Sequence, residues 1–145
     1  MLELFYEINY LSVLLAAAAG FMVAGAWYSK FLFSRAWMEE NKFTEKDLTD
    51  PVPAMVKSFL AYLVLAFGIA TIFLMMKPIG SILPGAEMTA LEGAKWGFFL
   101  AVLVHGVAGL PNYIYEKKTL THFLIHTSNS ALSMAVMGAI LAVMN

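Results

Sequence analysis

The sequence predicts an all-α membrane protein with four transmembrane helices and a short cytoplasmic amphipathic helix between the first and second. Three observations support this. Four stretches each approach the roughly 20 apolar helical residues that cross a hydrocarbon core of about 30 Å. Hydrophobic residues make up 61% of the chain and charged residues 13%, against about 45–50% and 25% in soluble domains. Residues 11–23 contain one hydroxyl group and no charge, so a soluble bundle with polar stripes is disfavoured.

The predicted spans form a single four-helix transmembrane domain over residues 1–145. They cover residues 10–27, 56–76, 93–110 and 123–144. The first span follows Glu3 and Glu7 without a preceding Lys or Arg, so we expect it not to be a cleaved signal peptide. Aromatic residues flank it, as they do at membrane interfaces: Tyr6 and Tyr10 at one end, Trp27 and Tyr28 at the other.

The connection after the first span contains the only sizeable element outside the membrane. In residues 29–41, apolar side chains recur at helical spacing and charged ones occupy the other faces. This pattern predicts an amphipathic helix, which lies on the cytoplasmic headgroups or folds back on the bundle. Residues 44–47 (Thr-Glu-Lys-Asp) predict a second, capped turn.

Local signals predict where the other spans begin and end. Asp50 and Pro51 suit the start of the second span, and residues 78–85 predict a turn-rich connection because they contain two prolines and two glycines. Thr89 and Glu92 have capping-box spacing ahead of the third span. Pro111 predicts a kink or an end there.

The distribution of basic residues predicts the orientation. Both terminal tails have no basic residue. Seven lie in or beside the first and third loops: Lys30, Arg35, Lys42, Lys46, Lys57, Lys117 and Lys118. The second loop has only Lys77 and Lys95 at its edges. Short loops rich in Lys and Arg stay in the cytoplasm, so we expect both termini outside.

Composition also excludes several classes of function. The net charge of −1 gives no sign of a nucleic-acid partner. The chain has no cysteine, which excludes disulfides, thiol redox chemistry and cysteine metal sites. No convincing nucleophile–base–acid arrangement or phosphate-binding glycine loop is present. We therefore expect no enzymatic activity and no cofactor.

Small residues at four-residue spacing predict where helices pack. Ala16, Gly20 and Ala24 form one such row, and Gly93, Gly97, Ala101, His105 and Gly109 form another. Such rows let helix backbones approach closely in lipid. We expect them to be contact faces within one protomer or between protomers.

Polar and histidine side chains gather near the predicted cytoplasmic ends of the third and fourth spans. The cluster comprises His105, Asn112, His122, His126, Asn129, Ser130 and Ser133. His122 and His126 are four residues apart and share one helix face. A rise of about 1.5 Å per residue places His105 and His126 at similar depths. Polar groups at such depths are costly unless they face the bundle interior or a watery crevice.

Three interpretations of this cluster stay open. The side chains are interhelical contacts that satisfy one another, or they line a crevice that binds or passes a small solute or protons. In the third interpretation they form a metal or haem site, with His105, His122 and His126 as candidate ligands and Glu116 as a further one. The HxxxH spacing suits a metal, but the fourth span supplies no acidic partner.

The chain also resembles a bacterial membrane family known as domain of unknown function 1761. The resemblance rests on residues 25–29 (Gly-Ala-Trp-Tyr-Ser), 36–38 (Ala-Trp-Met) and 43–48, and on apolar runs in the fourth span. Its most specific residues are Trp27, Tyr28, Ser29 and Trp37. The resemblance implies a small four-helix protein of the bacterial inner membrane and implies no chemistry.

Together, these observations favour a multi-pass protein that works by association in the bilayer. The expected partners are the lipid bilayer and either further copies of the chain or a larger membrane complex. The alternatives are a small solute or ion transporter with a polar pathway between the third and fourth helices, and a histidine-based metal or haem protein.

Overall fold

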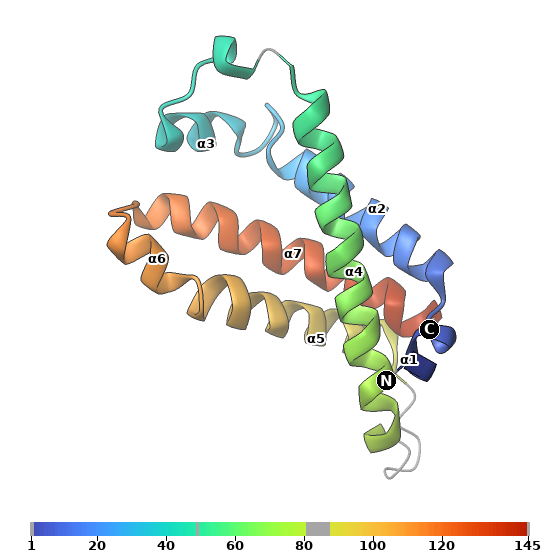
Figure 1. Ribbon diagram of the computed structural model, residues 1–145. Helices are drawn as coiled ribbons and strands as arrows, with labels where there is room; N and C mark the ends of the chain where they lie inside the picture. The colour runs from blue at the N-terminus through green and yellow to red at the C-terminus, as the bar shows by residue number, and fades with distance from the viewer. Residues whose placement is uncertain (1, 49, 81–87, 145) are drawn as a thin grey trace.

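The computed structural model describes residues 2–48, 50–80 and 88–144, and this part of the chain is helical without a strand. The elements in chain order are α1 (Leu2–Glu7), α2 (Tyr10–Trp27), α3 (Ser34–Asn41), the 3-10 helix η1 (Glu45–Leu48), α4 (Val52–Gly80), α5 (Ala90–Ala101), the π-helical turn η2 (Val102–Val107), α6 (Leu110–Tyr115) and α7 (Leu120–Met144). Figure 1 shows α5 and α6 running beside α7, while α4 crosses the bundle.

Four helical segments are long and apolar enough to cross a membrane, which confirms the predicted fold class. They are Tyr10–Trp27, Val52–Met76, Ala90–Tyr115 and Leu120–Met144. Large apolar side chains are exposed along them, including Leu11, Val64 and Phe98. Exposed apolar side chains are expected where lipid replaces water as the surrounding medium.

Capping side chains set several helix starts. Val52 N donates to Asp50 Oδ1 (3.3 Å), so α4 begins before the predicted residue 56. Thr119 Oγ1 accepts from His122 N (3.1 Å), and α7 likewise begins before residue 123. The predicted capping box is present, because Thr89 and Glu92 each bond the other's backbone N–H. Of the predicted turn-rich connection, residues 81–87 lie outside the described residues, and residues 78–80 belong to α4.

The third span is interrupted, but one turn earlier than Pro111 predicts. In η2 the backbone widens into a π-helical turn, in which Ala108 N donates to Leu103 O (2.8 Å). A proline crowds the carbonyl four residues before it, and for Pro111 that residue is Val107, the last of η2. The proline itself lies in the first turn of α6, so its effect on the helix appears ahead of it.

The amphipathic helix is shorter than the predicted 29–41. The chain leaves α2 through a tight turn in which Phe33 N donates to Trp27 O (3.0 Å), and α3 begins only at Ser34. The predicted turn at residues 44–47 is present, because both Thr44 N and Thr44 Oγ1 donate to Asp47 Oδ2. These hydrogen bonds hold the pKa of the Asp47 carboxyl below its ordinary value.

The last helix, α7, is the centre of the molecule. It packs against α5, α2 and α4, and α2 also packs against α4. Against α5 the backbones touch: a Cβ on Gly97 would lie 2.0 Å from Met134 O, and a Cβ on Gly93 would lie 2.2 Å from Gly138 O. The predicted row of small residues on the third span is thus a contact face within one protomer.

Polar contacts join distant segments of the chain at both ends of the bundle. At one end, here called the terminal end, Asn9 Nδ2 donates to Met144 O (2.8 Å). At the opposite end, the loop end, Thr119 Oγ1 donates to Glu40 Oε2 across the first and third loops. Both described chain ends therefore lie on one side of the bundle and these two loops lie on the other, as Figure 1 also shows.

Candidate functional site

The Trp-Tyr-Ser segment after α2 is attached to α7. Trp27 Nε1 donates to Ile125 O (3.1 Å), and Tyr28 Oη lies 2.9 Å from His126 Nδ1. The Tyr28 ring also packs on Trp37 of α3, with ring centroids 5.8 Å apart. Ser29 contributes its backbone, since its carbonyl accepts from Leu32 N (3.1 Å). These contacts fix the end of α2 against the histidine face of α7.

The contact with Tyr28 assigns the tautomer of His126. Burial raises the pKa of Tyr28 to about 12, so its hydroxyl keeps its proton. No other acceptor for this proton is found among the described residues. We therefore assign the hydroxyl as donor to Nδ1, which leaves the neutral imidazole with its proton on Nε2.

His122 joins α3 to α7. Its Nε2 lies 3.2 Å from Asn41 Oδ1, and Asn41 Nδ2 donates to Trp37 O (2.8 Å). A carbonyl oxygen can only accept, so Nε2 of His122 is the donor. The remaining ring atom, Nδ1, is buried and has no hydrogen-bond partner among the described residues. His122 thus belongs to the junction of α3 and α7.

The histidines do not form a metal site with further ligands in the described part of the chain. The rings of His122 and His126 have centroids 4.5 Å apart, as their spacing predicts. No group of three or more His, Cys, Asp or Glu side chains that could hold a metal ion is found among the described residues. Each ring also has one nitrogen engaged by a protein group, Asn41 or Tyr28.

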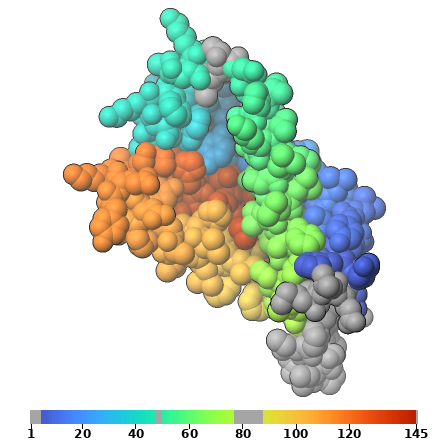
Figure 2. Space-filling view, in the orientation of Figure 1, coloured from blue at the N-terminus to red at the C-terminus, as the bar shows by residue number. Residues whose placement is uncertain are grey.

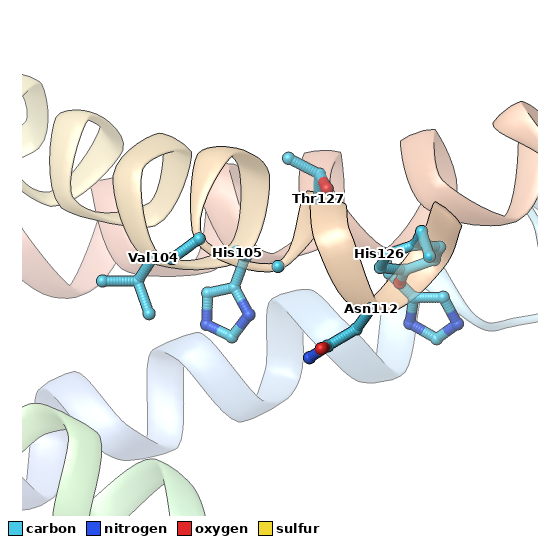
Figure 3. A pocket seen from close by; sticks show the side chains of 8 residues that line it. Val104, His105, Asn112, His126 and Thr127 are labelled. Atoms are coloured by element: carbon cyan, nitrogen blue, oxygen red, sulfur yellow. The ribbon is translucent and has the colours of Figure 1, made fainter. Parts of the chain in front are cut away.

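A cavity of about 320 Å³ lies between α7 and the interrupted third span. Its polar lining residues are His105 of η2, Asn112 and Tyr113 of α6, and His126 and Thr127 of α7; the others are Val104, Ala108 and Gly109. Figure 3 shows the side chains of His105, Asn112 and His126 extending to one side of these helices. We call this space the His105 cavity.

Several polar groups of this cavity are not engaged by the protein. Thr127 Oγ1 is buried without a hydrogen-bond partner among the described residues. In the same part of the chain, His105 and Asn112 make no side-chain hydrogen bond, and both are exposed. The π-helical turn places His105 on the widened part of the helix, and such turns are frequent at functional sites.

A second cavity, of about 170 Å³, lies on the other side of His105. It is lined by Ala61, Tyr62 and Leu65 of α4, by His105, and by Ser130, Ser133 and Met134 of α7. Tyr62 Oη donates to Ser133 Oγ (3.4 Å), which donates in turn to Asn129 Oδ1 (3.5 Å). Figure 2 shows the surface hollowed between α4 and the third span, with α7 at the bottom.

The predicted polar cluster is therefore divided among three places. His122 holds α3, while His105, Asn112 and His126 line the His105 cavity. Ser130 and Ser133 line the second cavity, where the buried Asn129 bonds Ser133. His105 and His126, which the sequence places at similar depths, line the same cavity.

A comparison with protein families places the chain. The model of a protein family of unknown function, DUF1761, matches residues 11–142. The chain belongs to the DUF1761 family. No curated protein and no solved structure matches it.

Membership of DUF1761 gives the motif residues a structural setting without a biochemical one. Trp27, Tyr28 and Trp37 are the most specific residues of the resemblance. Trp27 bonds the Ile125 carbonyl of α7, Tyr28 contacts His126, and Trp37 packs on Tyr28. In this member, the motif thus positions a residue that lines the His105 cavity.

Sequence reasoning missed several residues of the site. Asn41 and Tyr62 were not predicted as site residues, because nothing in the local sequence distinguishes either one. Thr127 was identified only as part of the polar run at residues 127–130. Asn41 contacts α7 because the chain turns and brings α3 back to the bundle. The helical pattern of the sequence does not reveal this turn. Thr127 follows His126 directly, and its place in the cavity depends on the relative rotation of α7 and η2.

Proposed function

We propose that this DUF1761 member binds a small hydrogen-bonding molecule within the membrane, in the His105 cavity. One observation supports this most strongly. His105, Asn112 and Thr127 have no side-chain partner among the described residues, and they line one cavity together with His126. Polar groups at membrane depth are expensive and usually serve a function.

The size of the cavity agrees with this role. Ligand pockets usually occupy about 300–1,000 Å³ and combine an apolar lining with a few polar groups. The His105 cavity, at about 320 Å³, lies at the lower end of this range. A small molecule that hydrogen-bonds to these groups would remove the cost of leaving them unpaired at membrane depth.

The second cavity supports a pathway as an extension of binding. His105 lines both cavities, and Ser130, Ser133 and Tyr62 continue the polar surface along α7. A solute that leaves the His105 cavity on this side would pass hydroxyl groups rather than lipid. We propose this route for transport if the bound molecule crosses the membrane.

Self-association is the second candidate function. The hollow between α4 and the third span is lined in part by Ser130 of α7, which is partly exposed, and such polar groups must be covered at membrane depth. A further copy of the chain or a partner subunit would cover them. Native mass spectrometry of gently extracted protein measures this: a defined oligomer supports the proposal, and a monomer at every protein concentration contradicts it.

We place the protein in a bacterial inner membrane with both termini outside. The support is the excess of Lys and Arg in the first and third loops, which meet at the loop end. On this orientation the His105 cavity lies in the cytoplasmic half of the bilayer.

A cavity-filling variant tests the binding function. Ala108→Leu fills the His105 cavity, whereas Ala54→Leu adds the same volume at an exposed position of α4 outside both cavities. Protein extracted gently from its membrane is compared by native mass spectrometry and thermal unfolding. We expect a small-molecule mass that Ala108→Leu loses and Ala54→Leu keeps. Equal retention in both variants, or no bound molecule and no stabilising compound for the wild type, would contradict the proposal.

A further inference from the structure

This inference rests on the proposed binding function and names the class of ligand. We propose that the His105 cavity takes the ring of a neutral, membrane-soluble compound that carries hydrogen-bond acceptors, which is the chemistry of a quinone. The argument uses the charge, the donors and the position of the cavity.

The cavity lining contains no permanent charge. Its eight residues include no Asp, Glu, Lys or Arg. A carboxylate, phosphate or ammonium group would have to leave water without a counter-charge, which costs several kcal/mol per ion in proteins. The lining therefore selects against charged headgroups and in favour of a neutral ligand.

The polar groups come from two elements. His105 and Asn112 belong to the third span, whereas His126 and Thr127 belong to α7. Between them lie small or apolar residues, Val104, Ala108 and Gly109. This arrangement fits a largely apolar ring that carries more than one polar atom.

The contact with Tyr28 fixes His126 as a hydrogen-bond donor. Because the Tyr28 hydroxyl donates to Nδ1 of His126 (2.9 Å), the imidazole keeps its proton on Nε2. Asn112 supplies an amide N–H and Thr127 a hydroxyl. A ligand whose polar atoms only accept hydrogen bonds, as quinone carbonyls do, matches this set.

The position of the cavity favours a ligand that arrives through the bilayer. Its lining residues lie within two segments long and apolar enough to span the membrane. Val104, Ala108 and Asn112 are exposed, so the cavity has an opening beside side chains that face lipid. A quinone already dissolved in the hydrocarbon region reaches such an opening without crossing water.

The test uses the full chain in nanodiscs prepared without quinone. A short-chain oxidised quinone is titrated while binding is followed by calorimetry and by thermal unfolding. We expect saturable one-to-one binding, weakened at least tenfold by Ala108→Leu and unchanged by Ala54→Leu. Loss of one neutral hydrogen bond in Asn112→Leu should weaken binding roughly two- to tenfold. Tyr28→Phe, a positioning variant, should weaken the quinone but not an apolar ring of equal size that lacks carbonyl groups.

Parallel probes separate this inference from the function on which it rests. Glycerol represents a neutral water-soluble solute, and phosphatidylglycerol in the nanodisc represents a charged lipid headgroup. If glycerol or phosphatidylglycerol binds, Ala108→Leu weakens that binding and the quinone does not bind, the assignment of a quinone is overturned and the binding function stands. Failure of all three probes would overturn the quinone, and the native-extraction comparison then decides the binding function separately. Quinone binding that ignores Ala108→Leu would place the ligand elsewhere and also overturn the inference.

Discussion

At the scale of residues, the contact between Tyr28 and His126 connects two parts of the chain that are 98 positions apart. A phenol and a neutral imidazole can each donate or accept a hydrogen bond, but here their contact assigns one role to each. The hydroxyl keeps its proton because its pKa is raised to about 12 by burial, and the ring accepts that proton at a single nitrogen. The contact therefore fixes both the position of the motif and the donor state of His126.

Removal of this hydroxyl should destabilise the protein modestly. Tyr28→Phe leaves the ring in place and deletes one hydrogen bond, so we expect a loss of about 0.5–1.5 kcal/mol in thermal or denaturant unfolding. Tyr115→Phe is the matched control because Tyr115 is 86% exposed. If the two variants unfold alike, the hydroxyl contributes nothing to stability.

The Tyr28 contact also predicts an alkaline limit. The folded pKa lies above the unfolded value of 10.0, so the contribution of Tyr28 to stability is complete below pH 10 and is lost as the pH rises towards 12. A stability–pH profile of the wild type should therefore decline in this window more steeply than that of Tyr28→Phe. Parallel profiles would contradict the assignment.

At the scale of elements, α3 is held to α7 by few contacts. None of its residues is buried, and His122 and Glu40 provide its polar connections to α7 and the third loop. The sequence predicted a surface helix here with two possible positions, on the headgroups or on the bundle. The structure supports the second, because Asn41 returns to α7, and this depends on a side chain that no periodicity identifies.

Loss of the Asn41 side chain should release α3. Asn41→Leu leaves the buried Nε2 of His122 without its acceptor, which costs about 1–3 kcal/mol. We expect faster tryptic cleavage after Arg35 and Lys42 of the folded protein, measured by limited proteolysis. Lys42→Ala is the control for a change at the exposed surface, and in this variant only cleavage after Arg35 is measured. The same cleavage rate after Arg35 in Asn41→Leu and in the control would contradict the role of Asn41 in holding α3 to α7.

The contact between α5 and α7 permits a comparison of two glycines. Gly97→Ala places a methyl group 2.0 Å from Met134 O, whereas nothing lies within 4 Å of the same group at Gly25. Alanine otherwise favours a helix over glycine by up to about 1 kcal/mol. We therefore expect Gly97→Ala to lower the unfolding temperature and Gly25→Ala to leave it equal or higher. The reverse order would show that α5 and α7 do not touch at this position.

The sequence predicts features that depend on neighbouring residues better than features that depend on how the helices pack. The spans followed from apolar length, and the Gly93–Gly97 row followed from its spacing, because both depend on neighbours in the chain. The break in the third span was expected at Pro111 and lies in η2, since the proline acts on the preceding turn. The division of the polar cluster into a junction and two cavities depends on helix rotation, which the sequence of one helix does not specify.

At the scale of the whole molecule, the absence of cysteine makes the topology directly measurable. Single cysteines at Tyr6, Lys46 and Lys117 replace exposed side chains. With a membrane-impermeant thiol reagent on intact cells, we expect Tyr6→Cys to be labelled and Lys46→Cys and Lys117→Cys to be labelled only after the cells are broken. The opposite pattern would show that the protein has the opposite orientation in the membrane. Labelling of Lys46→Cys and Lys117→Cys from different sides would contradict the four-span topology.

The central position of α7 has a consequence for biogenesis. Of the four spans, α7 is synthesised after the other three, so α2 and α4 can pair before it appears, whereas the Gly93 and Gly97 face of α5 lacks its partner until then. Even the amide of Asn9, near the start of the chain, finds its partner only at Met144. The bundle can therefore close only after α7 has been synthesised. A translation product truncated before residue 120 would offer quality-control proteases an incomplete bundle.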